Sequence, residues 1–325
     1  MQICSVNKQG LTCQRGLILL HRYCYSLYGY QLLSDISLPL RTTQGQEYTG
    51  DAEDSFSLQH RGVDQMPLDE DVFVDLDKGF SQIRSPIASY TIDVKNRYLE
   101  VSSKSQEEII STLFNIPFSI ISSLRGEVLL HASSIMSAHN SVVAFCGKKA
   151  AGKSTLVAHL AKMKPFFGDD TLNIKLMDRR LSCYSAGDFI KMSQETFKSV
   201  GLKETLFSCY KKNIQGKAYV DCSSAGLLVS DRSTDLCLSR IYFVSRHNEN
   251  RIAIQRIECD LQKRAFLVSN IVGVGYLPAK VVAYIANSSV FKSILKTVEL
   301  YSLKIPHDIA NINNVARDVG TLIFD

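Results

Sequence analysis

The stretch Gly147-Lys148-Lys149-Ala150-Ala151-Gly152-Lys153-Ser154-Thr155 matches G-x-x-x-x-G-K-[ST], the pattern of a loop that wraps backbone amides around phosphate groups. Residues 141–146 before it form a short apolar run typical of a buried strand, and residues 155–162 after it are rich in helix formers. Gly147 and Gly152 permit backbone angles that other residues rarely adopt, which brings N–H groups close to the phosphates. The sequence therefore predicts an α/β fold organised around a phosphate-binding loop.

Each position of this loop has an expected task if the loop holds a nucleotide. Lys153 would reach the terminal phosphates, and Ser154 would offer its hydroxyl to a magnesium ion. The first turn of the following helix adds N–H donors and the positive end of the helix dipole. The other predicted nucleotide contacts are Gly147, Lys148, Ala150, Ala151, Gly152 and Thr155. The alternative is a glycine-containing turn between strand and helix that binds nothing.

Composition sets modest bounds on the class of protein. The chain has 325 residues, of which 45% are hydrophobic and 21% charged, as is ordinary for a globular protein of one large or two small domains. Its formal net charge of +5 includes no block of like charges, so we expect no nucleic-acid partner, and an anionic substrate would explain the balance equally well. The longest apolar segment, residues 109–121, is interrupted by Asn115 and Pro117, so no membrane span is expected.

The cysteines indicate the compartment. There are nine, an odd number without a C-x-x-C pair, which is typical of reduced, buried thiols in a reducing environment. The apolar run at residues 16–20 is too short for a secretory signal. We therefore expect a cytoplasmic protein.

The texture of the sequence changes near residue 125. Upstream, we expect short strands at 25–33, 55–61, 71–76 and 90–101, separated by polar turns such as residues 42–54. A helix is expected to follow at 106–124. Strands and helices alternate downstream, with strands at 127–136, 141–146, 171–176 and 238–245 and helices at 155–162 and 260–270. These patterns predict a β-rich N-terminal lobe over residues 1–125 and an α/β domain over residues 126–325.

A pair of carboxylates follows the loop after one helix and a turn. Asp169 and Asp170 stand at the start of an apolar strand, and a strand parallel to the loop strand would deliver them beside the terminal phosphate. One carboxylate could hold magnesium while the other accepts the proton of an attacking hydroxyl. The alternative is an ordinary Asp-Asp turn or helix cap.

His131 interrupts the apolar strand at 127–136. A lone histidine in such a strand is more often a satisfied core residue than a catalyst. Residues 184–191 are expected to form a strand and a turn. Lys217 belongs to a locally basic stretch with Lys203, Lys211 and Lys212 that is either a solvated face or a source of a second phosphate contact.

Three elements in this order, Leu130-His131-Ala132, the loop at 147–155 and Asp169-Asp170, resemble the HPr kinase/phosphorylase family. They are more similar to its shorter relatives, the HPr-kinase-related serine kinases, which also share an opening segment like residues 28–40. The resemblance implies a P-loop kinase core of the HPr-kinase/PEP-carboxykinase type with an N-terminal β-rich lobe. It further implies magnesium-dependent transfer of the γ-phosphate of ATP, or of another nucleoside triphosphate such as GTP, to a hydroxyl.

The resemblance also assigns tasks to the matched residues. Asp169 would be the general base, Asp170 would support the metal, Lys153 would neutralise the migrating phosphoryl group and His131 would line the catalytic pocket. Lys148 and Lys149 replace the usual Pro-Ser of the family's loop, and the glycine-rich signature linked to hexamer assembly and to the reverse reaction is not found. The implied acceptor is a serine of a peptide or small protein, for instance a ribosomal peptide natural product such as a lasso peptide, and assembly into a homo-oligomer is left open.

Two other classes of function remain as alternatives. A small-molecule kinase, or a decarboxylating relative of the ATP-dependent phosphoenolpyruvate carboxykinases, would share the loop, but the latter needs a metal-binding Lys/His/Asp cluster that the sequence does not display. A nucleotide-gated binding module would bind ATP and transfer its phosphate to no acceptor.

Overall fold

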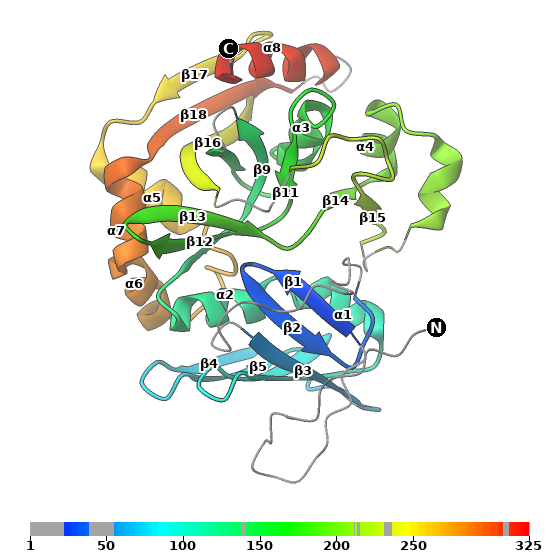
Figure 1. Cartoon of the computed structure of the whole chain (residues 1–325), viewed down its shortest axis with the longest axis vertical. Coiled ribbons are helices and arrows are strands. Elements are labelled where there is room, and N and C mark those ends of the chain that lie inside the picture. Colours follow the sequence, from blue (N-terminus) through cyan, green and yellow to red (C-terminus); the bar gives the residue numbers. More distant parts are fainter. Residues whose placement is uncertain are drawn as a thin grey trace.

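The computed structural model describes residues 23–38, 55–137, 141–210, 212, 215–230, 236–307 and 312–324. Within these ranges the chain forms a mixed α/β protein with two large sheets (Figure 1). The following sequence-based expectations lie outside the described residues: the polar turn at 42–54, the run at 16–20, Cys4, Cys13 and Lys211.

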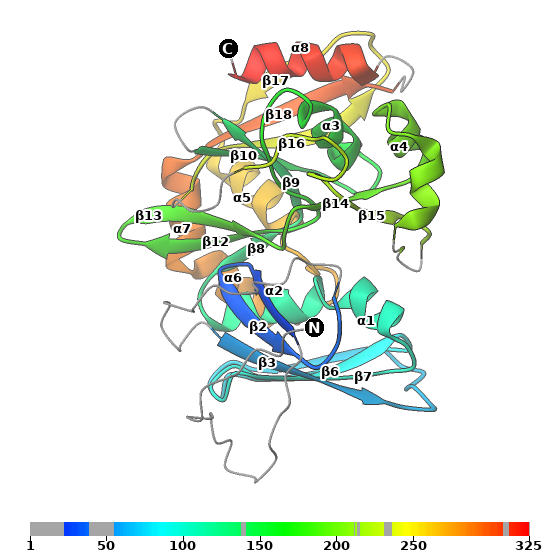
Figure 2. The ribbon, with the colours of Figure 1, turned by 45° about the vertical axis from the view of Figure 1, so that its right-hand side comes forward.

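The first sheet is a seven-stranded sheet in the described part of the chain, with the order β1-β2-β3-β7-β6-β5-β4. Its strands are β1 (Tyr23–Leu27), β2 (Tyr30–Ser34), β3 (Ser55–Gly62), β4 (Asp71–Asp75), β5 (Phe80–Arg84), β6 (Ala88–Asp93) and β7 (Tyr98–Ser103). Buried and partly exposed residues alternate along β6 and β7, as expected for a sheet with one covered face. Helices α1 (Gln106–Thr112) and α2 (Ile116–Leu124) cover that face (Figure 2).

Three elements predicted as single segments are divided in the structure. The strand expected at 25–33 is a hairpin, because Tyr28 and Gly29 adopt positive φ angles of 54° and 73° and make a tight turn. The strand expected at 90–101 is likewise the hairpin β6–β7. The helix expected at 106–124 breaks in two, since Pro117 lacks the N–H that would continue α1 and instead occupies the first turn of α2.

The second sheet contains the loop strand. Nine strands of the described residues belong to it, in the order β11-β9-β10-β16-β13-β12-β8, with β18 beside β16 and β17 beside β18. These strands are β8 (Val128–Leu130), β9 (Ala132–Ser137), β10 (Ser141–Cys146), β11 (Phe166–Gly168), β12 (Leu172–Met177), β13 (Arg180–Ser185), β16 (Cys237–His247), β17 (Ala253–Arg256) and β18 (Glu299–Pro306). A separate two-stranded sheet pairs β14 (Phe189–Met192) with β15 (Ala218–Asp221).

Helices cover both faces of the second sheet. Val142, Ala144 and Cys146 of β10 belong to one buried cluster, and Val143 and Phe145 belong to another, because successive side chains of a strand point to opposite faces. One face packs on α3 (Lys153–Leu160) and α8 (Ile312–Phe324). The other packs on α5 (Asp260–Ser269), α6 (Ala279–Asn287) and α7 (Ser289–Thr297). The α4 helix (Gln194–Ser199) and the short 3-10 helix η2 (Glu204–Cys209) lie beside the two-stranded sheet (Figure 1).

The strand predicted at 127–136 also divides, and its break falls at His131. Residues before the break pair with β12, whereas residues after it pair with β10 and β11. The chain therefore changes its sheet partners at His131, which leaves that residue outside both ladders. A side chain at such a break can face a site rather than pack regularly on one face of a sheet.

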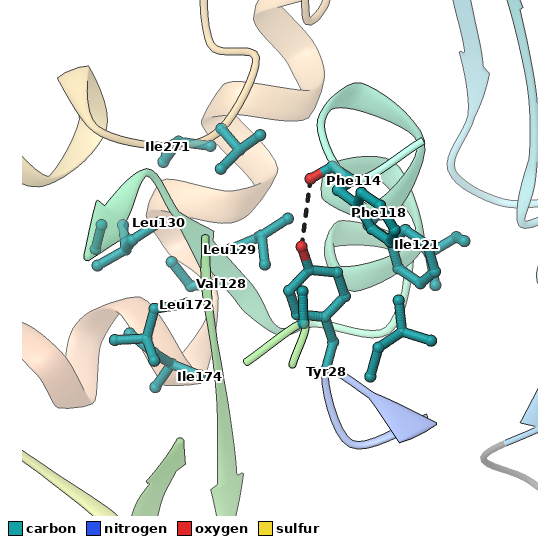
Figure 3. Packing of buried hydrophobic residues seen from close by; sticks show 14 of the residues in the cluster. Tyr28, Phe114, Phe118, Ile121, Val128, Leu129, Leu130, Leu172, Ile174 and Ile271 are labelled. Carbon is teal, nitrogen blue, oxygen red and sulfur yellow. Dashed lines mark hydrogen bonds between the residues drawn. The ribbon is translucent and has the colours of Figure 1, made fainter. Parts of the chain in front are cut away.

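The two sheets share a core around Tyr28. Its ring packs on Phe118 at a centroid distance of 5.0 Å, and its hydroxyl donates to the Phe114 carbonyl at 3.4 Å and contacts the Thr171 hydroxyl (Figure 3). Leu129 and Leu172 from the second sheet lie in the same cluster (Figure 3). Among the described residues, no helix combines the length and the apolar character needed to cross a bilayer.

Candidate functional site

The glycine loop joins β10 to α3 and has the backbone that its pattern requires. Gly147, Ala150 and Gly152 have positive φ angles of 147°, 67° and 94°. A Cβ atom at Gly147 would lie 2.4 Å from the carbonyl oxygen of Val244, so only glycine fits there. Ala150 is a non-glycine residue in the left-handed region, a strained conformation that accumulates at ligand-binding sites. The loop is therefore a tight, pre-shaped turn at the start of a helix.

Two residues from distant segments hold this loop, and neither was predicted as part of the site. The side-chain oxygen of Asn270, at the end of α5, accepts from the Gly147 N–H at 2.8 Å. Arg246, near the end of β16, donates from Nε to the Ala151 carbonyl at 3.1 Å and from Nη1 to the Pro306 carbonyl at 2.6 Å. Its guanidinium also fills the space beside Gly152, where a Cβ would lie 2.2 Å from Nη2. Helix α5 and strand β16 thus set the position of the loop.

Lys153 folds back over the loop that it follows. Its ammonium donates to the carbonyl oxygens of Gly147 at 2.7 Å and Lys148 at 3.3 Å, and the residue is only 6% exposed. Burial lowers the pKa of this ammonium, and the thiol of Cys146 and the carboxylates of Asp169 and Asp170 oppose that shift. The loop carbonyls hold Lys153 at the place where the sequence predicts bound phosphates.

Asp169 follows β11 and is buried. It is 3% exposed, and both its oxygens accept hydrogen bonds: one from the Ser133 hydroxyl at 2.5 Å, the other from the Lys191 backbone N–H at 2.9 Å. Ser133 lies next to Asp169 because β9 and β11 pair in an antiparallel ladder that places Gly168 opposite Ser134. No task was expected of Ser133, and three of the six residues of β9 are serines, so the composition of the strand does not single it out.

Asp170 lies beside the Lys191 ammonium and the His131 imidazole. Its φ angle of 70° is left-handed, a conformation that residues other than glycine rarely adopt. One oxygen accepts from the Lys191 ammonium at 2.7 Å, and the other lies 3.9 Å from Nδ1 of His131. Burial alone would raise the pKa of Asp170, but Lys191, His131 and Lys153 together lower it to about 2. The carboxylate is therefore ionised throughout the neutral range.

His131 lies beside the second oxygen of Asp170. Its backbone N–H donates to the Asn270 carbonyl at 2.7 Å, so the residue that caps the end of α5 contacts both the loop and the strand break. Burial lowers the pKa of the imidazole below its ordinary value of 6.5, and Asp170 only partly offsets the shift. His131 is consequently neutral at pH 7 and can accept or donate a hydrogen bond there.

Lys191 contacts both acids, although only a strand and a turn were expected around it. It lies on β14, its backbone binds Asp169 and its ammonium binds Asp170. The ammonium also lies 5.3 Å from the centre of the Tyr219 ring, on the paired strand β15. Although burial would lower its pKa, Asp170 raises that pKa above its ordinary value, so Lys191 remains charged.

The structure brings His131, Lys153, Asp169 and Asp170 to one region: His131 lies 3.9 Å from Asp170, Lys191 binds both acids, and both acids oppose the lowering of the pKa of Lys153. Lys217 contributes a small further lowering of the pKa of Lys153. Among the other predicted contacts, Lys148 and Ala150 are exposed, Ala151 is buried, and Ser154 is half-buried in the first turn of α3. Thr155 shares a hydrogen bond of 3.1 Å with Thr196 of α4.

The donor set suits magnesium that arrives with a nucleotide. In the described part of the chain, no three His, Cys, Asp or Glu side chains converge as a metal cage. Magnesium usually takes one or two carboxylates and completes its shell with phosphate oxygens and water. An ionised Asp170 and the Ser154 hydroxyl at the helix start are ligands of this kind.

The observed features define a mixed α/β protein with a phosphate-loop pattern beside paired carboxylates. No protein-family model and no curated protein matches the chain. Among solved structures, it is similar to the Hpr(Ser) kinase/phosphatase from Coxiella burnetii, with 13% identity and a TM-score of 0.33 over 60% of this chain and 87% of that chain. At that TM-score the likeness does not establish a shared site.

Proposed function

We propose that this protein is a magnesium-dependent kinase with a P-loop core of the HPr-kinase/PEP-carboxykinase type. It would transfer the γ-phosphate of ATP, or of another nucleoside triphosphate, to a serine hydroxyl of a peptide or small protein. The observation that carries the proposal is the juxtaposition of Lys153 with Asp169 and Asp170 beside the strained glycine loop. Phosphoryl transfer needs this combination of an anion-binding turn, a cation for the phosphates and acids for metal and alcohol.

In the proposed reaction, a bond forms between the serine oxygen and the γ-phosphorus while the bond from that phosphorus to the β–γ bridging oxygen breaks. The electron pair of the broken bond remains on the nucleoside diphosphate. Asp169 receives the hydroxyl proton; each oxygen of a carboxylate can accept two hydrogen bonds, so those from Ser133 and Lys191 leave capacity for a third. Because the transition state is loose, positioning and charge stabilisation supply most of the acceleration.

The remaining residues position or neutralise charge. Lys153 exchanges its loop carbonyls for phosphate oxygens when a nucleotide binds, and backbone N–H groups of the loop surround the phosphates. Asp170 and Ser154 would hold magnesium, which screens the charge of the phosphates when it is bound. Neutral His131 orients a phosphate or the acceptor hydroxyl through a hydrogen bond. Lys217 is the proposed second cation near the phosphates.

The acceptor class rests on the resemblance of the three sequence elements to HPr-kinase-related serine kinases. A serine of a small ribosomal peptide, such as a lasso peptide, fits that resemblance. We expect the reaction to take place in the cytoplasm.

The test is incubation with γ-labelled ATP, magnesium and a panel of serine-bearing peptides and small proteins, followed by mass spectrometry. We expect one acceptor class to gain a phosphoserine. Lys153→Ala should lower transfer by about 100-fold or more through lost charge stabilisation. Lys162→Ala, at an exposed position just after the same helix, is the matched control and should leave transfer unchanged.

Asp169→Asn separates binding from chemistry. It should lower transfer by about 100-fold or more, because the general base is lost, while nucleotide binding is retained. Purified protein without magnesium-dependent affinity for any nucleoside triphosphate would contradict the proposal. Protein that binds ATP but phosphorylates no acceptor, water included, would instead be a nucleotide-gated binding module.

A further inference from the structure

Lys191 and Lys175 are two largely enclosed lysines that each pair with a carboxylate, yet their surroundings differ. Both side chains are 10% exposed. Lys175 lies 3.5 Å from Glu127, whose oxygens also accept from Tyr30 and Asn173, and the Glu127 side chain is 8% exposed. This pair is enclosed, and its hydrogen-bond partners lie within the fold, where the pair joins the two sheets.

The partner of Lys191 is more open. The Asp170 side chain is 24% exposed, three times the fraction for Glu127, and the oxygen that does not bind Lys191 lies only at 3.9 Å from His131. Asp170 is thus partly accessible, whereas the side chain of Lys191 that binds it is largely enclosed. An enclosed ion pair stabilises a fold, whereas an ion pair with one accessible carboxylate can be exchanged.

The backbone and side-chain contacts of Lys191 permit such an exchange. Its backbone is fixed, since its N–H donates to Asp169 and β14 pairs with β15. The ammonium stands on a flexible four-carbon stem near the Tyr219 ring, and the Tyr219 hydroxyl donates to the Ile110 carbonyl at 3.1 Å. The head group can therefore move while the backbone that holds Asp169 stays in place.

We infer that Lys191 is an internal counter-ion of the site: it neutralises Asp170 in the nucleotide-free protein and moves to the transferring phosphoryl group when magnesium and nucleotide bind. This inference rests on the proposed function. Two positive centres compete for the same carboxylate, so release of the lysine is linked to metal binding, and the linkage is reciprocal. Lys191 keeps its proton throughout, because the acceptor proton goes to Asp169.

The linkage predicts opposite effects of one substitution. Lys191→Met removes the competitor, so the magnesium concentration for half-maximal nucleotide binding should fall by about fivefold or more. The same variant lacks the cation for the phosphoryl group, so turnover at saturating magnesium, nucleotide and acceptor should fall by about 100-fold. If Lys191 had only a structural role, its replacement would not lower the magnesium concentration needed for half-maximal nucleotide binding.

The measurement is a magnesium titration of nucleotide binding, by fluorescence of a labelled non-hydrolysable ATP analogue and without acceptor. Lys175→Met is the matched control and should leave the magnesium midpoint unchanged, as should Lys191→Arg, which keeps the charge. A midpoint in Lys191→Met that is unchanged or raised overturns the inference while leaving the kinase proposal intact. A wild-type protein that shows no magnesium-dependent binding overturns the kinase proposal itself.

A second measurement uses the wild-type protein and does not depend on the folding of any variant. In protein labelled with ¹⁵N at lysine, the ammonium resonance of Lys191, assigned by its loss in Lys191→Arg, should shift on addition of magnesium and the analogue. The resonance of Lys175 should stay in place. A Lys191 resonance that is the same with and without bound magnesium and analogue refutes the exchange.

Discussion

Ser133→Ala tests whether the buried serine orients the acid of the site. The substitution removes one hydroxyl from a position with 0% exposure and leaves the backbone of β9 free to stay as it is. The lost hydrogen bond joins Oγ to Asp169 at 2.5 Å. Hydrogen bonds to charged groups contribute about 1.5–3 kcal/mol, and burial of both partners favours the upper part of that range, so we expect a loss of about 2.5 kcal/mol in the free energy of unfolding.

Ser134→Ala is the matched control. Ser134 is equally buried and is the next residue of the same strand, but it donates to the neutral carbonyl of Gly168 at 3.3 Å. Its loss should cost about 0.5–1 kcal/mol. With a urea slope of about 3 kcal/mol per molar, Ser133→Ala should lower the unfolding midpoint by about 0.8 M and Ser134→Ala by about 0.3 M.

The functional readout separates orientation from stability. If Asp169 is the base, a loosened carboxylate should reduce turnover with bound nucleotide and acceptor, while nucleotide affinity stays unchanged. In an Asp169→Asn background the further cost of Ser133→Ala should shrink toward that of Ser134→Ala, because the charged acceptor is gone. Equal midpoint shifts for the two serine variants would refute the reasoning.

Three further outcomes are expected. Gly147→Ala, whose Cβ would lie 2.4 Å from the Val244 carbonyl oxygen, should abolish binding of the labelled ATP analogue. Gly275→Ala is the control, because its Cβ would have no atom within 4 Å, and it should bind the analogue normally. The pKa of Asp170 is lowered in the folded state to about 2 from 3.8, so the ionised carboxylate stabilises the fold above about pH 4, and this contribution is lost as the pH falls toward 2. The urea midpoint of unfolding should therefore change less between about pH 4 and about pH 2 in Asp170→Asn than in the wild-type protein. Glu127→Gln leaves the buried Lys175 without this carboxylate partner and should lower the free energy of unfolding by about 3 kcal/mol. A change below about 1 kcal/mol in equilibrium unfolding would contradict the view that this pair joins the two sheets.

The loop could be read from the sequence because its requirements are local. Gly147 and Gly152 meet steric demands of a single turn, and the apolar runs on either side have the periods of a strand and a helix. The strands at 55–61, 71–76 and 171–176 were predicted within a residue or two for the same reason. The hairpin at Tyr28 and Gly29 and the helix break before Pro117 were visible as turn and proline signals, but they were merged into longer elements.

The residues that support the site gave no such signal. Ser133 contacts Asp169 across 36 positions of sequence, and the loop anchor Asn270 contacts Gly147 across 123. Lys191 belongs to the short strand β14, and only the tertiary structure brings that strand next to Asp169 and Asp170. Contacts of this kind depend on which strands pair and in what register, and no local pattern encodes them.

What the sequence determined by itself was therefore the set of short-range backbone constraints: a tight glycine turn, a lysine after it and two adjacent acids one helix later. The tertiary structure decided which groups neutralise and orient those residues, with Lys191 on Asp170 and Ser133 on Asp169. The physical reason is that local steric preferences act within a few neighbouring residues, whereas the surroundings of a buried charge are assembled from whichever strands and helices pack around it.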